Sequence, residues 1–253
     1  MNILEKILNV KRQEIQQIKD FEFGEMAGQN RSLKDALSKP GISVIAEIKM
    51  KSPSEGEIFS YADPAQIAKG YESAGAAAIS VLTDQSFFGG SLDILKSVRD
   101  AVSIPVIRKD FIIDQKQISE TIHYNGDAFL LIADALDQDS LQQLMNIGKM
   151  AGLEFLVEYH AEKHAEYIFA LNPEIVGINC RNLKTMATDI TYFEKMISSL
   201  PSNSVKVAES GIHTSDDLEY VSDLGYDAAL IGTSLMKTGN PGKALETLIG
   251  GLS

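Results

Sequence analysis

Hydrophobic runs and amphipathic stretches alternate along this 253-residue chain. The apolar runs have the length of buried strands, and the stretches between them carry apolar residues at helical spacing. The expected strands span residues 43–49, 76–83, 104–110, 127–133, 153–159, 175–179, 204–210 and 228–232. The expected helices between them include residues 63–75, 91–101, 139–152, 161–171 and 214–225.

Several helix boundaries carry local signals. Asp63, which a proline follows, and Thr214 are typical residues for the position before a helix. Gly75, Gly152 and Gly225 stand where the expected helices should end.

The N-terminal segment precedes the first expected strand and predicts a helix of its own. Its apolar residues follow helical spacing: Ile3, Leu4, Ile7, Leu8, Ile15 and Ile18. Charges interrupt this segment before a signal-peptide core could form, and no apolar run in the chain approaches membrane-spanning length.

Eight strands that alternate with helices predict an α/β fold with parallel strands and right-handed crossovers. A (β/α)8 TIM barrel fits eight such units in this length, although local patterns leave an open doubly wound sheet possible. No linker-like stretch divides the chain. We therefore expect one domain over residues 1–253, with a helical extension in residues 1–40 and the barrel in residues 41–253.

Composition and charge narrow the class of protein. The chain is 44% hydrophobic and 23% charged, as globular proteins are. Its net charge of −12 argues against a general surface for nucleic acid or anionic membranes. Cys180 is the single cysteine, which excludes an intrachain disulfide and suits a reducing, cytoplasmic location. The oligomeric state does not follow from the sequence.

Polar side chains recur at the carboxyl ends of the expected strands, where barrel active sites form. They are Glu47, Lys49, Lys109, Glu158, Asn179, Arg181, Glu209 and Ser210. Any one of them could be an exposed strand tip or part of a structural ion pair. Their repetition at one end of many strands predicts a reaction centre.

Small residues follow the last two expected strands. Ser210 and Gly211 follow the seventh, and Gly232, Thr233 and Ser234 follow the eighth. Barrels commonly bind phosphate with the backbone N–H groups of these two loops. The pair of loops therefore predicts a phosphorylated substrate.

The histidines give no comparable signal. His160 and His164 have a spacing that metal ligands use on a helix, but the sequence shows no partnered third ligand. We expect both to be solvated residues at the start of the helix, and we expect no metal site. His123 and His213 are isolated, and nothing beside them favours a catalytic over a surface role.

A set of motifs in fixed order resembles the indole-3-glycerol phosphate synthase family. The motifs are AEIKMKSPS (46–54), SVLTDQSFFGGS (80–91), IPVIRKDFIID (104–114), GINCRNL (177–183), VKVAESGI (205–212) and ALIGTSLM (229–236). The last two also occur in related phosphate-binding barrels. The AEIK…SPS, LTDQSFFGGS and RKDF motifs in this order are specific.

The resemblance implies an enzyme of tryptophan biosynthesis, a carboxy-lyase. Its substrate would be 1-(2-carboxyphenylamino)-1-deoxyribulose 5-phosphate. The reaction closes the pyrrole ring and releases carbon dioxide and water to yield indole-3-glycerol phosphate. The resemblance implies no cofactor and no metal, and it leaves association with other enzymes of the pathway open.

The resemblance also implies roles for the catalytic residues. Lys109 would be the general acid that protonates the ketone oxygen, and Glu158 the general base that accepts a proton as the indole forms. Glu47 would be a further acid/base or positioning group. Lys49 would assist anion binding and could share the acid chemistry, so the division of acid roles stays open.

The same resemblance assigns the binding residues. Asn179 and Glu209 would hold substrate hydroxyls and the catalytic groups, and Arg181 would attract the substrate carboxylate or brace the acidic groups. Phe88 and Phe111 would flank the aromatic ring.

Ser52 would join the loops at residues 210–211 and 232–234 in binding phosphate. The N-terminal helix matches a family extension near the barrel mouth.

Four positions depart from the family pattern. Cys180 stands where a second asparagine is common, and Met50 where a basic residue is frequent. Glu55 replaces a common lysine and Thr233 a common glutamate. None of these departures removes an expected proton carrier.

Two other functions remain open at this stage. A Schiff-base aldolase would use Lys109 as a nucleophile, but Glu47 and Glu158 would tend to keep that lysine charged. A non-catalytic barrel would have lost proton carriers that this chain retains.

Overall fold

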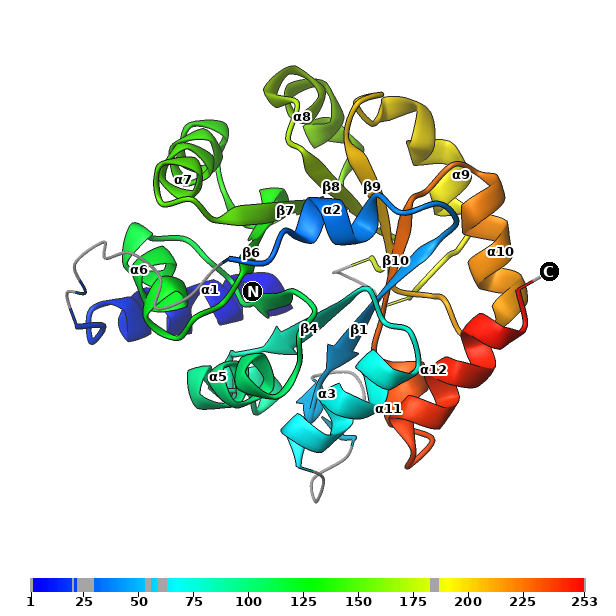
Figure 1. Cartoon of the computed structure of the whole chain (residues 1–253). Coiled ribbons are helices and arrows are strands. Elements are labelled where there is room, and N and C mark those ends of the chain that lie inside the picture. The colour runs from blue at the N-terminus through cyan, green and yellow to red at the C-terminus, as the bar shows by residue number, and fades with distance from the viewer. Residues whose placement is uncertain are drawn as a thin grey trace.

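The computed structural model describes residues 2–19, 21, 30–52, 56–58, 63–182 and 187–252. Parallel strands form a closed eight-stranded barrel in the order β1-β10-β9-β8-β7-β6-β5-β4 (Figure 1). They are β1 (Ser43–Ile48), β4 (Ala78–Leu82), β5 (Val106–Lys109), β6 (Ala128–Ile132), β7 (Glu154–Tyr159), β8 (Ile175–Asn179), β9 (Val205–Glu209) and β10 (Ala228–Ile231). The predicted strands are therefore confirmed. Because the sheet closes on itself, the fold is the TIM barrel and not the open doubly wound sheet.

Helices surround the barrel (Figure 1). The α-helices are α1 (Ile3–Ile15), α2 (Leu33–Leu37), α3 (Pro64–Ser73), α4 (Gln85–Phe88), α5 (Leu92–Ala101), α6 (Gln115–His123), α7 (Gln138–Met150), α8 (Ala165–Leu171), α9 (Tyr192–Met196), α10 (Ser215–Asp223), α11 (Thr233–Met236) and α12 (Pro241–Gly250). Short 3₁₀ helices are η1 (Ala133–Ala135), η2 (Glu162–His164) and η3 (Ile197–Ser199). A small antiparallel pair, β2 (Lys51–Ser52) and β3 (Gly56–Glu57), follows β1.

The predicted boundary signals act as expected. The side chains of Asp63 and Thr214 accept backbone hydrogen bonds at the starts of α3 and α10. Gly75, Gly152 and Gly225 have positive φ values of 96°, 70° and 93°, which only glycine adopts freely. The predicted helix at 161–171 is divided into η2 and α8.

The strands are buried on both faces, as parallel sheets require. One set of side chains, exemplified by Val44, Ala46 and Ile79, packs against the surrounding helices. The alternate set, exemplified by Ile45 and Ile107, fills the barrel interior. This alternation decides which residues at the strand ends point into the barrel mouth.

The two N-terminal helices lie at opposite ends of the barrel. Leu33 and Leu37 of α2 are fully buried with residues that begin the strands. Ile3, Leu4 and Ile7 of α1 instead line a cavity at the carboxyl ends of the strands. Figure 1 shows α2 crossing the near opening of the barrel.

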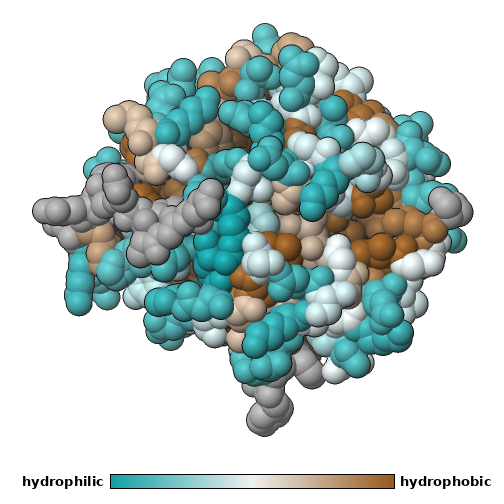
Figure 2. Space-filling model, in the orientation of Figure 1, coloured by the Kyte–Doolittle hydropathy of each residue, from teal (hydrophilic) through white to brown (hydrophobic). Residues whose placement is uncertain are grey.

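The outer surface on the α2 side is predominantly hydrophilic. Figure 2 shows hydrophilic residues over much of the rim, with a hydrophobic area beside the C-terminal end and others near the centre, at the top and at the upper left. Among the described residues, no helix is both long enough and apolar enough to cross a membrane.

Candidate active site

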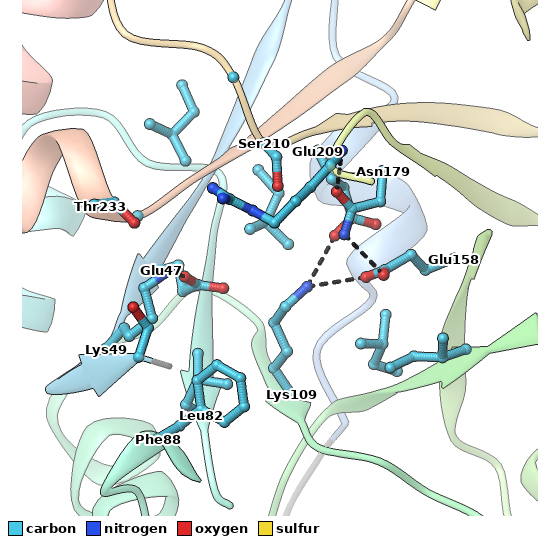
Figure 3. A pocket seen from close by; sticks show the side chains of 18 of the residues that line it. Glu47, Lys49, Leu82, Phe88, Lys109, Glu158, Asn179, Glu209, Ser210 and Thr233 are labelled. Atoms are coloured by element: carbon cyan, nitrogen blue, oxygen red, sulfur yellow. Dashed lines mark hydrogen bonds and ion pairs between the residues drawn. The ribbon is translucent and has the colours of Figure 1, made fainter. Parts of the chain in front are cut away.

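A cavity opens at the carboxyl ends of the barrel strands (Figure 3). It contains every residue that the sequence predicted for the site. These are Glu47, Lys49, Ser52, Phe88, Lys109, Phe111, Glu158, Asn179, Arg181, Glu209, Ser210, Gly211, Gly232, Thr233 and Ser234. The strand ends therefore bring together residues that lie up to 187 positions apart.

Strand periodicity explains why the proton carriers converge. Side chains two positions apart on a strand share one face, so Glu47 follows the interior residue Ile45 to the same side. Lys109 follows interior Ile107 in the same way. The register between β8 and β9 pairs Asn179 with Glu209, so these two strand-end residues lie side by side.

Lys109 and two carboxylates form the centre of the site (Figure 3). Lys109 Nζ donates to Glu158 Oε2 at 3.1 Å and to Glu209 Oε2 at 2.9 Å. Asn179 Nδ2 donates to the other oxygen of Glu158, at 3.0 Å. Glu158 and Glu209 are almost fully buried, at 4% and 1% exposed. One ammonium group thus joins two carboxylates that water barely reaches.

Burial and charge set the protonation of these groups. Burial opposes the charge on Lys109, but attraction to Glu158, Glu209 and Glu47 outweighs it and raises the lysine pKa. Burial also opposes the charge on Glu158, yet Lys109 and hydrogen bonds hold its pKa below the ordinary value. Burial and repulsion from Glu158 raise the pKa of Glu209 to about 8. At neutral pH the site holds a charged lysine, an ionised Glu158 and a protonated Glu209.

Two strand-end glycines make room for these carboxylates. A β-carbon on Gly177 would lie 2.3 Å from Glu209 Oε1, and one on Gly232 would lie 2.4 Å from Glu47 Oε1. Both distances are far inside van der Waals contact, so any larger residue would displace a carboxylate. Gly177 is thus a part of the site that sequence reasoning missed.

The second charged pair is Glu47 with Lys49. Lys49 Nζ donates to Glu47 Oε1 at 2.6 Å, and Glu47 is only 3% exposed. The lysine provides the positive charge that a buried carboxylate requires, and both side chains line the cavity.

An aromatic wall occupies the side of the cavity near β4 and β5. The rings of Phe88 and Phe111 have centroids 6.2 Å apart and are tilted by 33°. Leu82 and Leu130 extend this apolar lining. Such a surface suits a flat aromatic group.

The loops after β9 and β10 form the opposite side of the cavity. Ser210 and Gly211 have φ values of 71° and 72°. For the non-glycine Ser210 this conformation costs roughly 1–3 kcal/mol, and such strain concentrates at functional sites. Ser234 Oγ donates to the backbone oxygen of Ile212 at 3.2 Å, which ties the two loops together.

The remaining positions are Ser52, expected to bind phosphate, and three of the departures from the family pattern: Cys180, Met50 and Glu55. Ser52 lies in β2 and is buried at the cavity wall. Cys180 is buried, and its Sγ donates to the backbone oxygen of Ser210, so it supports the loop after β9. Burial raises the pKa of the Cys180 thiol to about 11. Met50 packs against the hydrophobic core, and Glu55 lies outside the described residues.

The expectation that both histidines are solvated was wrong for His164, which is buried at the start of α8, and His160 is half-buried. His164 is 7% exposed, and its Nε2 lies 3.4 Å from Asp134 Oδ1. His160 Nδ1 lies 2.8 Å from the backbone oxygen of Asn179, and its ring stacks on Tyr192. His160 therefore links the ends of β7 and β8, whereas His164 contacts η1, which follows β6. The described residues contain no group of three or more side chains that could hold a metal ion.

Several lining residues were not predicted. They are Ile3, Leu4, Ile7, Leu82, Asp110, Leu130, Ile132, Ile212, His213, Leu230 and Ile231. Leu82 lies on β4, and Leu130 and Ile132 lie on β6; these are strands for which the sequence predicted no polar strand end. His213 gave no signal, because only the path of the loop after β9 brings it to the cavity.

The chain matches a known protein family over nearly its whole length. The family model for indole-3-glycerol phosphate synthase matches residues 4–248. The chain belongs to the indole-3-glycerol phosphate synthase family. This confirms the resemblance drawn from the motifs.

Individual relatives support the same family assignment. The chain is 43% identical over 252 residues to the indole-3-glycerol phosphate synthase of Halalkalibacterium halodurans, which covers 98% of this chain and 97% of the relative. It is 46% identical over 214 residues to that of Mycolicibacterium gilvum, covering 85% and 79%. A solved 3-hexulose-6-phosphate synthase superposes with a TM-score of 0.65 at 12% identity, covering 84% of this chain and 100% of the other. That likeness concerns the barrel fold alone.

Proposed function

We propose that this chain closes the indole ring of 1-(2-carboxyphenylamino)-1-deoxyribulose 5-phosphate, with loss of carbon dioxide and water. The observation that carries the proposal is the ammonium of Lys109 held between Glu158 and Glu209 in one cavity with an aromatic wall. Membership of the indole-3-glycerol phosphate synthase family supports the same reaction.

Lys109 acts as the general acid of ring closure. The aromatic carbon that bears the carboxylate attacks the ketone, and the carbonyl oxygen needs a proton as the new carbon–carbon bond forms. The raised pKa keeps Lys109 charged, so it has a proton to donate and lacks the free lone pair that a Schiff-base nucleophile needs. Loss of carbon dioxide then leaves the bonding electrons in the new ring.

Glu158 acts as the general base of the final step. Departure of the new hydroxyl as water leaves the ring with one proton that it must lose to become aromatic. Glu158 is ionised and directed by Asn179, so it can accept that proton from ring carbon. Glu47 and Lys49, which share a short hydrogen bond at the cavity wall, protonate the departing hydroxyl or hold the group that does.

The remaining residues divide between the two ends of the substrate. Phe88 and Phe111 enclose the aromatic ring, and Arg181 attracts the substrate carboxylate. Glu209 Oε1, a buried atom without a hydrogen-bond partner among the described residues, receives a substrate hydroxyl. We place the phosphate at Ser52 of β2 and at the loops that contain Ser210, Gly211, Gly232, Thr233 and Ser234.

We expect the purified, metal-stripped protein to convert this substrate. Indole fluorescence and released carbon dioxide should rise together and in equal amounts, because the proton transfers use side chains only. A folded protein that binds the substrate but releases neither product would overturn the proposal in favour of a non-catalytic barrel. Restoration of activity by added metal alone would overturn the side-chain mechanism.

The raised pKa of Glu209 predicts a pH effect on catalysis. Below about pH 8 Glu209 is protonated, whereas above that pH it adds a second negative charge beside Glu158 and Lys109. The added charge makes Lys109 a weaker acid and repels the anionic substrate. We expect kcat/KM to fall as pH rises through about 8, and Glu209→Gln to remove that decline from the profile.

Urea unfolding provides an independent check that the raised pKa belongs to Glu209. The Glu209 pKa rises from an ordinary 4.5 to about 8 in the folded protein, so between these values only the folded state holds the proton. Its contribution to the free energy of unfolding is complete below pH 4.5 and is lost as pH rises toward 8. The stability difference between the wild type and Glu209→Gln should therefore change over this range in urea titrations. A constant difference would contradict the assignment.

A further inference from the structure

A buried lysine in α1 joins the N-terminal helix to the mouth of the barrel. Lys11 is 4% exposed, although lysine is rarely buried. Its Nζ lies 2.7 Å from Glu14 Oε2, 3.0 Å from Asp84 Oδ2 and 2.9 Å from Asp110 Oδ1. Burial opposes the charge, but attraction to Asp110 and Asp84 outweighs it and raises the pKa of Lys11. The helix thus inserts a permanent positive charge between two strand-end loops.

Each of the two aspartates holds the backbone of a cavity aromatic. Asp84 Oδ1 accepts hydrogen bonds from the backbone N–H groups of Phe87 at 2.7 Å and Phe88 at 3.3 Å, which caps α4. Asp110 Oδ1 accepts the backbone N–H of Phe111 at 2.8 Å. Asp110 also follows Lys109 directly. One ammonium therefore bridges the two carboxylates that set the positions of Phe88 and Phe111.

The two aspartates depend on Lys11 to different degrees. Asp110 also pairs with Arg108 at 3.1 Å and accepts from Thr83 Oγ1 at 2.7 Å. Asp84 is fully buried, and its Oδ2 has no hydrogen-bond partner among the described residues besides this ion-pair contact. An uncompensated buried carboxylate is strongly unfavourable, so without Lys11 the Asp84 side chain would turn toward water and release the cap of α4.

α4 also contacts the elements on either side of it, so release of its cap would affect these contacts as well. Ser86 Oγ donates to Glu14 Oε1 of α1 at 3.1 Å, and Lys51 Nζ of β2 donates to the backbone oxygen of Ser86 at 3.1 Å. α4 therefore lies between α1 and the small β2–β3 pair. Its terminal residue is Phe88, in the cavity wall.

We propose that Lys11 is a positioning residue that holds Phe88 and Phe111 at the spacing required for the aromatic ring of the substrate. Lys11 thereby makes the docked N-terminal helix part of ring recognition, although Lys11 is not among the residues that line the cavity. The proposal rests on the function given above, in which these two rings enclose the anthranilate part of the substrate.

The test is Lys11→Met, which keeps the length of the side chain and removes the charge. We expect KM for the full substrate to rise by about tenfold or more, because ring binding depends on close placement, with a smaller change in kcat. Inhibition by anthranilate should weaken by a similar factor. Inhibition by inorganic phosphate should be unchanged, because the ion pairs of Lys11 are with Glu14, Asp84 and Asp110 and not with the phosphate-binding residues.

Amide hydrogen exchange tests the same idea without activity. In the wild type, Asp84 and Asp110 accept hydrogen bonds from the backbone N–H groups of Phe87, Phe88 and Phe111. Lys11→Met should speed hydrogen exchange at these three groups. Arg99→Met is the matched control, since Arg99 also forms a buried ion pair, with Asp127 at 2.8 Å, outside the cavity lining. It should lower stability while leaving KM and those three amides unaffected.

The double variant Lys11→Met/Asp84→Asn separates positioning from general destabilisation. The asparagine oxygen can still cap α4, but the uncompensated charge is gone, so exchange protection and anthranilate inhibition should return toward wild type. If Lys11→Met leaves KM and exchange unchanged, or if the double variant is as impaired as the single one, the proposal is wrong. Lack of turnover by the wild type would instead overturn the proposed function, and the exchange result would still decide the role of Lys11.

Discussion

Replacing Lys109 with alanine is expected to lower kcat by about 10²–10⁴-fold, the range that a general acid contributes. Lys109 donates hydrogen bonds to both Glu158 and Glu209, so its ammonium is a proton source at the centre of the cavity. Binding of inorganic phosphate should be largely retained, because the phosphate loops do not involve this lysine. Single-turnover measurements with the full substrate would separate loss of chemistry from loss of binding.

Lys34→Ala is a suitable control for this experiment. Lys34 lies in α2 at the opposite end of the barrel and pairs with Glu174 at 2.6 Å. Its side chain is 43% exposed, so its removal should leave kcat unaltered. Near-normal turnover by Lys109→Ala would refute the general-acid role. A covalent adduct trapped on Lys109 by borohydride in the presence of substrate would establish a Schiff base instead.

Replacing Glu158 with glutamine is expected to lower kcat by about 10²–10⁴-fold with a small change in KM. The amide keeps the shape of the carboxylate but cannot accept the final proton. It also places an NH₂ group against either Lys109 or Asn179, both of which donate to Glu158, so one hydrogen bond must be lost. Rapid-quench measurement of carbon dioxide and indole would locate the defect.

The order of the steps makes this result specific. Carbon dioxide leaves before the final proton is removed, so Glu158→Gln should release carbon dioxide faster than it forms indole in the first turnover. Equal and undiminished rates of both products would remove Glu158 from the mechanism.

The same variant should also lower the pKa of Glu209, because repulsion from Glu158 is one cause of its elevation. The alkaline decline of kcat/KM should then move to lower pH.

Local patterns in the sequence determined the secondary structure and the polar strand ends. Strands buried on both faces appear as short apolar runs of neighbouring residues, so the eight strands were predictable. The placement of Glu47, Lys109 and Glu158 after apolar runs was equally local. Family motifs then supplied chemistry for residues whose polar character alone left several functions open.

The structure corrected those expectations where contacts join distant segments. His160 and His164 look like helix-start residues in the sequence, yet Asn179 and Asp134, from other parts of the chain, enclose them.

The sequence by itself determined that this protein is an α/β chain with proton carriers at one end of its strands and motifs of indole-3-glycerol phosphate synthase. The tertiary structure decided that the sheet closes, that Lys109 joins Glu158 to Glu209, and that Lys11 joins α1 to both aromatic loops. These features depend on strand register and on burial. Both arise between residues far apart in the chain, whereas hydrophobic periodicity reports only on near neighbours.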